Sequence, residues 1–300
     1  MTSVTNFVET EYFTHVRASL AASTVSGYQG LWRMHGKRFD GLSLEIRTCD
    51  AQGILRRIAA ENPALTKTTL GHAKAFFSGI WTHALRMGVT NQQNPWPSVA
   101  IPTAPEPTET YAYSATEIET MLRVLDMPAE LAVLTAACTG LRKSEIKGLR
   151  CQDWDAASST LSVRQSVWRK HVGKTKSKAS KAPVPVVPIL ADRLKRHCAN
   201  RAGPEPIFVS SVGTPLDLDN VARREIVPAL ENTSVRWHGW HAMRRGLATF
   251  LHAKGIPDKE IQSILRHSNV AVTQSCYVRT IPQNVRLAMD LVDFGSGGNH

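Results

Sequence analysis

The chain has 300 residues, 42% of them hydrophobic and 20% charged, which is enough for two domains with apolar cores and excludes a disulfide miniprotein, a disordered tail or a lone binding motif. Thirty-six Lys and Arg against 25 Asp and Glu give a formal charge of +11, which favours a polyanionic partner. The five scattered cysteines form no C-x-x-C pair and no apolar run approaches the roughly 18 residues of a membrane span, so we expect a soluble cytoplasmic protein without a membrane partner.

The first third of the chain predicts a bundle of about four helices. Apolar residues recur at helical spacing over residues 8–20 and again over 70–85. Ser23 and Thr24 are typical caps of a second helix, and Asn62-Pro63 marks a break. Five prolines then fall between residues 95 and 107, which favours an extended linker over a packed element. We therefore expect a helical domain over 1–95, a linker over 96–112 and a second domain over 113–300.

The second domain is predicted to be mainly α-helical with a small antiparallel β-sheet, an α+β fold. Ser114 and Glu117 match a capping box at the start of a helix. An apolar helical run over 128–138 ends at Gly140, and valines between residues 161 and 186 suggest short strands that flank a basic loop. Further helices are expected over 241–254, from Pro257 onward, and over 285–292.

The loop between these strands is unusually basic. Residues 156–191 contain seven Lys or Arg and no acidic side chain. A charge run of this kind is typical of a solvated hairpin tip, and it equally supplies cations for a phosphate backbone.

The segment TGLRKSEIKGL, residues 139–149, places Arg142 directly after a tight glycine turn. A guanidinium bonds two phosphate oxygens at once and stays charged, so Arg142 could position a phosphodiester and stabilise a five-coordinate phosphorus. The alternative is an ordinary surface ion pair between Arg142 and Glu145.

A second cluster, HGWHAMRR over residues 238–245, puts His241 and Arg244 on one face near the amino end of a predicted helix. His241 could donate a hydrogen bond to a phosphate oxygen or shuttle a proton, and Arg244 could supply a second guanidinium. A core histidine beside a surface arginine is the alternative. A zinc site from His238 and His241 is disfavoured, since no spaced third ligand follows.

The third cluster, LRHSNVAVTQSCY over residues 265–277, contains Arg266, His267 and Tyr277. A tyrosine hydroxyl has an ordinary pKa of about 10, so it needs a dense cationic pocket to act as a nucleophile. Cys276 is a competing nucleophile, and packing in a core is the alternative role for Tyr277.

Taken in order, the three clusters resemble the motifs of the tyrosine recombinase, or phage-type integrase, family. TGLRKSEIKGLRCQDWD is similar to the family's first box, HAMRR to its His-x-x-Arg box, and LRHSNVAVTQSCY to its final segment. The N-terminal half resembles the family's core-binding domain by its architecture. The resemblance implies a DNA-binding domain over 1–95 and a catalytic domain over 113–300.

The resemblance also implies residue roles. Arg142 and Arg244 would clamp the scissile phosphate, His241 and His267 would hydrogen-bond it, and Tyr277 would attack it to form a 3′-phosphotyrosyl link. Glu145 resembles the acidic residue that supports the family's site from behind. The family's general-acid lysine aligns with Lys176, with Lys174 and Lys178 as alternatives. The cations expected to contact DNA are Arg169, Lys170, Lys174, Lys178, Lys181, Arg245 and Arg266.

Two features depart from the family's pattern. Arg266 stands where the family usually has glycine and adds charge beside the site. The spacing from His267 to Tyr277 is one residue longer than the commonest pattern, which puts Cys276 where the tyrosine often stands.

The resemblance implies a site-specific DNA recombinase that acts on double-stranded DNA as a homotetramer on paired sites, in the cytoplasm at the nucleoid, with accessory proteins as candidate partners. The sequence contains no metal-ligand carboxylate cluster and no G-x-x-x-x-G-K-[ST] loop, so we expect no metal and no cofactor. The alternatives are a type IB topoisomerase and a DNA-binding regulator with a decayed active site.

Overall fold

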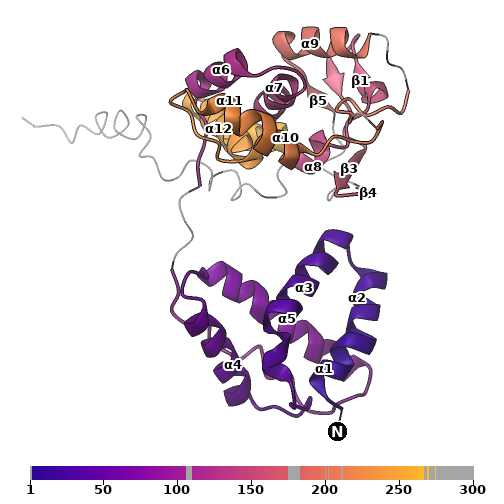
Figure 1. Cartoon of the computed structure of the whole chain (residues 1–300), viewed down its shortest axis with the longest axis vertical. Coiled ribbons are helices and arrows are strands. Elements are labelled where there is room, and N and C mark those ends of the chain that lie inside the picture. Colours follow the sequence, from indigo (N-terminus) through magenta and orange to yellow (C-terminus); the bar gives the residue numbers. More distant parts are fainter. Residues whose placement is uncertain are drawn as a thin grey trace, which may run out of the picture. The chain divides into compact units, whose positions relative to one another are not determined.

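The computed structural model describes residues 2–105, 110–174, 183–199, 201, 203–210, 212–266, 269 and 274. The chain divides into two compact units, Met1–Glu109 and Thr110–His300 (Figure 1). Each unit has its own apolar core. This division falls inside the predicted linker, residues 96–112.

Four helical segments build the N-terminal unit, as the sequence predicts. The first runs through α1 (Val4–Phe7), a π-helical turn (Val8–Tyr12) and α2 (Phe13–Ser19). The others are α3 (Ala22–His35), which continues into a 3-10 turn (Gly36–Phe39), α4 (Thr48–Glu61) and α5 (Lys67–Arg86). The predicted caps at Ser23 and Thr24 are wrong, because α3 begins at Ala22 and both residues lie within its first turn.

The start of the predicted linker also needs correction. Trp96 is fully buried and Val99 is 2% exposed, and both belong to the N-terminal core. The Trp96 ring packs on Phe77 with a centroid distance of 4.8 Å, and Lys74 Nζ donates to the carbonyl of Val99 at 2.6 Å. Proline content identified extended backbone there, but this backbone is packed against the helices.

The described part of the C-terminal unit contains eight α-helices and two short turns of 3-10 and π-helix. They are α6 (Ala115–Val124), α7 (Ala129–Thr139), α8 (Lys143–Ile146), a 3-10 turn (Cys151–Asp153), α9 (Pro188–Cys198), α10 (Leu218–Val221), a π-helical turn (Ala222–Ile226), α11 (Val227–Leu230), α12 (Trp240–Ala253) and α13 (Asp258–Leu265). The predicted helix over 285–292 lies outside the described residues.

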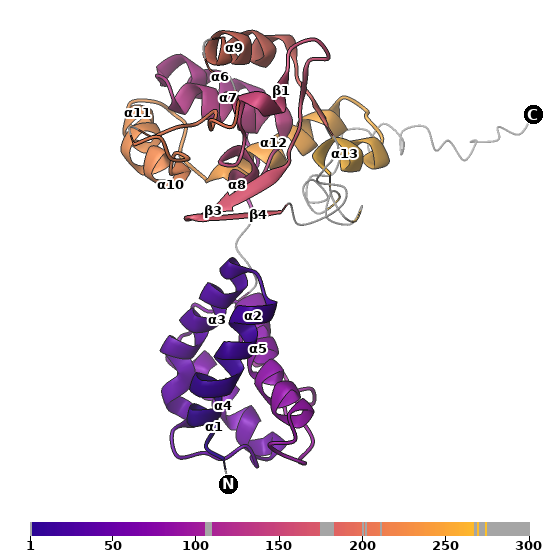
Figure 2. The same cartoon turned by 90° about the vertical axis from the view of Figure 1, so that its right-hand side faces the viewer.

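Two small antiparallel sheets complete this unit. One has the strand order β1 (Trp154–Asp155), β2 (Thr160–Leu161), β5 (Val184–Pro185), and Leu161 pairs with both Trp154 and Val184. The other is a hairpin of β3 (Gln165–Trp168) and β4 (His171–Lys174), which lies beside α8 (Figure 2). The predicted mainly helical α+β fold is confirmed.

Helix α7 lies at the centre of the C-terminal core. Almost every residue of α7 is buried, because α6, α9 and α12 pack around it. Ser114 and Glu117 form the predicted capping box at the start of α6. The helix ends at Gly140, whose φ of +60° lies in the left-handed region that favours glycine. Within the described residues, no helix is both long and apolar enough to cross a membrane.

Candidate active site

The turn that carries Arg142 packs closely on α13. A Cβ atom at Gly140 would lie only 2.5 Å from Cδ2 of Leu265 and 3.2 Å from Cδ2 of Leu247. Glycine is therefore needed here for its positive φ and for the close approach. Two residues later, Arg142 has extended backbone and is the N-cap of the short helix α8.

Glu145 accepts two hydrogen bonds from Arg142 and so fixes its position. The backbone N–H of Arg142 donates to Oε2 of Glu145 at 2.8 Å, and Nη1 of Arg142 donates to Oε1 at 3.0 Å. The Glu145 side chain is only 3% exposed, whereas that of Arg142 is 29% exposed. The ion pair considered as an alternative therefore exists, but its carboxylate is buried and its guanidinium reaches solvent.

Arg244 connects the Arg142 turn to the end of α13. It is 5% exposed, its Nη1 donates to the carbonyl of Gly140 at 2.5 Å, and its Nη2 donates to the carbonyl of Leu265. A buried guanidinium bonded to carbonyls at the C-terminal ends of two helices is not the surface arginine that was considered as the alternative. It fixes two segments that are far apart in the sequence.

His241 lies one helical turn before Arg244 and is exposed. Partial desolvation of its ring lowers its pKa, and the neighbouring cations Arg245, Arg244, Arg142 and Lys143 lower it further. The ring is therefore mainly neutral at neutral pH and has one N–H to donate. Arg142 and Arg244 both contribute to this shift, so these described members of the predicted set are close enough to interact electrostatically with His241.

The side chain of Arg266 is too deeply buried to contact DNA. Its side chain is 3% exposed, and its Nη2 donates to Oε2 of Glu145 at 2.9 Å. Burial lowers the pKa of this guanidinium, and the facing carboxylate of Glu145 raises it again. The expected DNA contact therefore needs correction: Arg266 bonds Oε2 of Glu145, whereas the guanidinium of Arg142 bonds Oε1 of the same carboxylate.

The other predicted DNA-contacting residues are placed as follows. Arg169 and Lys170 are exposed at the β3–β4 turn, and the guanidinium of Arg169 lies 4.8 Å from the ring centroid of Trp168. Arg245 is half-buried and its Nε donates to the carbonyl of Tyr111 at 2.6 Å. Lys174 ends β4. The remaining candidates lie outside the described residues: Lys176, Lys178, Lys181, His267, Cys276 and Tyr277.

Two lysines of the first motif were not predicted to take part. Lys143, beside Arg142, places its Nζ 2.6 and 2.7 Å from the two carboxylate oxygens of Asp219. Lys147 is 8% exposed, and its Nζ donates to the carbonyl of Arg169 at 3.1 Å, which anchors the basic hairpin turn. The sequence shows only that both lysines belong to a basic motif, because their partners lie 22 and 76 residues away.

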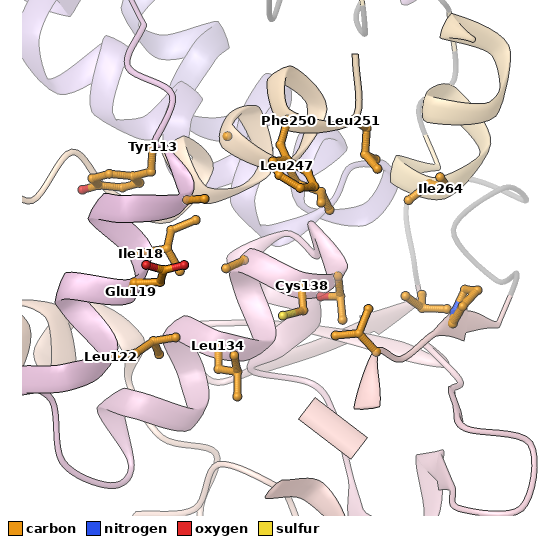
Figure 3. A pocket seen from close by; sticks show the side chains of 17 residues that line it. Tyr113, Ile118, Glu119, Leu122, Leu134, Cys138, Leu247, Phe250, Leu251 and Ile264 are labelled. Atoms are coloured by element: carbon orange, nitrogen blue, oxygen red, sulfur yellow. The ribbon is translucent and has the colours of Figure 1, made fainter. Parts of the chain in front are cut away.

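A separate apolar groove of about 490 Å³ lies between α6, α7 and α12 (Figure 3). Leu134, Leu247, Phe250 and Ile264 line it, and none of its described lining residues is Lys, Arg or His. Burial raises the pKa of Cys138 in its wall to about 11, so this thiol is protonated at neutral pH. A groove without cations does not suit a phosphate backbone, whereas the Arg142 cluster supplies them and is the candidate site.

Comparisons with known proteins agree with the motifs. Residues 112–283 match the model of the Phage integrase family. The chain is 24% identical to a tyrosine recombinase XerC-like protein of Caldanaerobacter subterraneus subsp. tengcongensis, over 96% of this chain and 82% of the relative. Its fold is similar to the Tn1549 transposon integrase in complex with a circular intermediate DNA, with a TM-score of 0.76, 20% identity, and coverage of 97% of this chain and 99% of that one.

A further solved structure, of a lambda integrase tetramer bound to a Holliday junction, matches with a TM-score of 0.65 and 18% identity, over 89% of this chain and 75% of that one. The fold and the family match together define a site-specific DNA recombinase of the tyrosine type. Because the family model covers more than half of the sequence, the chain belongs to the phage integrase family.

Proposed function

We propose that this recombinase cleaves and rejoins DNA strands through a 3′-phosphotyrosyl intermediate, with Tyr277 as the nucleophile. The observation that supports this most strongly is the convergence of Arg142, His241 and Arg244. These residues come from two helices, and Arg244 bonds directly to the turn that presents Arg142.

The proposed reaction exchanges one phosphoester bond for another. The hydroxyl oxygen of Tyr277 bonds to the scissile phosphorus while the bond from phosphorus to the 5′ oxygen breaks. The phenol gives its proton to solvent water, and the leaving 5′ oxygen takes a proton from the ammonium of Lys176, which becomes a neutral amine. Rejoining reverses each step, so the energy of the broken phosphodiester is kept in the covalent link and no nucleotide cofactor is consumed.

Each described residue has a separate task in this mechanism. Arg142 is partly exposed and carries a fixed charge, so it can stabilise the additional negative charge on the phosphoryl oxygens. Neutral His241 donates one hydrogen bond to the phosphate. Arg244 is mostly occupied with backbone carbonyls, so its contribution is to hold the turn as well as to add positive potential.

We also propose that double-stranded DNA is held by both units and that recombination uses four copies on paired sites. The exposed Arg169 and Lys170 offer phosphate contacts from the hairpin that Lys147 anchors. The similarity to a lambda integrase tetramer on a Holliday junction supports the assembly. The N-terminal unit would act as the core-binding domain, in the cytoplasm at the nucleoid, with accessory proteins as further partners.

The test uses duplexes with a nick in a randomised sequence, because the target site is unknown. Covalent protein–DNA complexes that survive SDS are captured and their DNA is sequenced, which yields a substrate. On this substrate, Arg142→Ala should form adduct at least about a hundredfold more slowly than the unchanged protein. Arg196→Ala is the matched control, since Arg196 has a 62% exposed side chain and an exposed partner, and should react at the normal rate.

Equal rates for the unchanged protein and Arg142→Ala would contradict the proposal. Strand transfer between two differently labelled duplexes separates a recombinase from a type IB topoisomerase, which would relax supercoiled DNA without pairing two sites. Specific binding without any adduct would instead identify a regulator with a decayed site.

A further inference from the structure

Arg266 combines two unfavourable features at one position. Its backbone is left-handed, with φ of +56°, a conformation that costs little for glycine and more for an arginine. Its guanidinium is also buried, and a buried charge is tolerated only with a partner. The contact with Glu145 supplies the partner for this buried charge, so this position does more than end α13.

The Glu145 carboxylate is divided between two guanidiniums. Oε2 accepts from the backbone N–H of Arg142 at 2.8 Å and from Nη2 of Arg266 at 2.9 Å, while Oε1 accepts from Nη1 of Arg142 at 3.0 Å. With Oε2 occupied, the Arg142 side chain meets the carboxylate through one hydrogen bond instead of a two-bond fork. The rest of the guanidinium stays available on its exposed side.

Arg266 also joins two segments that are 121 residues apart. Arg244 already links the carbonyls of Gly140 and Leu265, and the Arg266–Glu145 pair adds a second link beside it. Figure 2 shows α13, whose C-cap is Arg266, next to α12. The Arg142 turn is therefore held at two points from the same helix end.

We infer that Arg266 is a positioning residue for DNA cleavage: it fixes Glu145, and through Glu145 the guanidinium of Arg142, without itself contacting DNA. This inference rests on the proposed function. It assigns to Arg266 an effect on the rate of phosphate attack and none on DNA affinity, since its side chain is 3% exposed.

The test compares Arg266→Gly and Arg266→Lys with the unchanged protein on the captured nicked duplex. Glycine relieves the left-handed backbone and removes the cation, while lysine keeps the cation and the strain. We expect adduct formation to fall by about ten- to a hundredfold for Arg266→Gly, by much less for Arg266→Lys, and the Kd for DNA to change by less than about threefold. If the position matters only for its backbone, Arg266→Gly will react at least as fast as the unchanged protein, and the inference is overturned.

A double-variant cycle identifies Glu145 as the intermediary. In a Glu145→Gln background, Arg266→Gly should slow adduct formation by less than about threefold, because the carboxylate it acts on is gone. Full additivity would overturn the inference. If Arg266→Gly does not fold, Arg266→Lys is compared with Arg266→Gln, and equal rates for these two would also overturn it. Failure of the unchanged protein to form any adduct would contradict the proposed function instead.

Discussion

Replacement of Glu145 by alanine should destabilise the C-terminal unit strongly. The substitution leaves Arg266 3% exposed and without its carboxylate, whereas Arg142, at 29%, can recover water. Removal of one partner from a buried ion pair costs about 3–5 kcal/mol. For a unit of this size, such a loss corresponds to a fall in Tm of roughly 6–20 °C. The double variant Glu145→Ala/Arg266→Gly should recover about 2 kcal/mol or more, because it leaves no unpaired buried charge.

Hydrogen exchange in increasing urea, followed peptide by peptide, measures this loss separately in each unit. Peptides of α7 and α12 should report the lower free energy of unfolding, and peptides of α5 in the N-terminal unit should not change. A loss below about 1 kcal/mol, typical of an exposed pair, would show that the carboxylate does not lie buried between two guanidiniums. Equal losses for the single and double variants would refute the same reasoning.

Three further predictions concern the same unit. Gly140→Ala should lower the free energy of unfolding by about 2–4 kcal/mol, because φ at this position is +60° and the new methyl group would overlap with Leu265. Gly173 has open space around it, so Gly173→Ala should change the free energy of unfolding by less than about 0.5 kcal/mol. Equal losses for the two variants in urea titrations would contradict this prediction. The pKa of His241 is lowered in the folded state, so as the pH falls the unfolded chain binds a proton before the folded chain does. The free energy of unfolding should therefore decrease as the pH drops below about 6.5, and His241→Asn should make this decrease smaller. Identical pH profiles of unfolding free energy for the two proteins would contradict this prediction. The affinity for duplex DNA should fall steeply as the salt concentration rises. Arg169 is exposed, and Arg169→Ala should make the negative slope of log K against log salt concentration shallower by about one. An unchanged slope would show that Arg169 does not contact DNA.

Local rules predicted the elements that depend on a few neighbouring residues. The capping box at Ser114 and the left-handed end of α7 at Gly140 follow from residue types within four positions of each other, so the sequence was sufficient. The order of the three motifs likewise predicted Arg142, His241 and Arg244 as site residues; the structure bonds Arg244 to the Arg142 turn, and both arginines lower the pKa of His241.

The errors concern contacts between distant parts of the chain. Proline content shows that residues near Trp96 are extended, but not that they pack on Phe77 of α5. The charge of Arg266 suggested a DNA contact, because nothing in its neighbourhood reveals a carboxylate 121 residues earlier. The partners of Lys143 and Lys147 were missed for the same reason. Tertiary packing, which no local pattern encodes, decides whether a cation faces DNA or supports the site from behind.

The central claim is that a tyrosine forms the covalent link to DNA. The most direct measurement is mass spectrometry of the peptide that carries a nucleotide remnant after the captured adduct is digested. The account predicts that the modified residue is Tyr277 and that Tyr277→Phe abolishes the adduct while DNA binding is retained. A remnant on Cys276, or an adduct that persists in Tyr277→Phe, would contradict it.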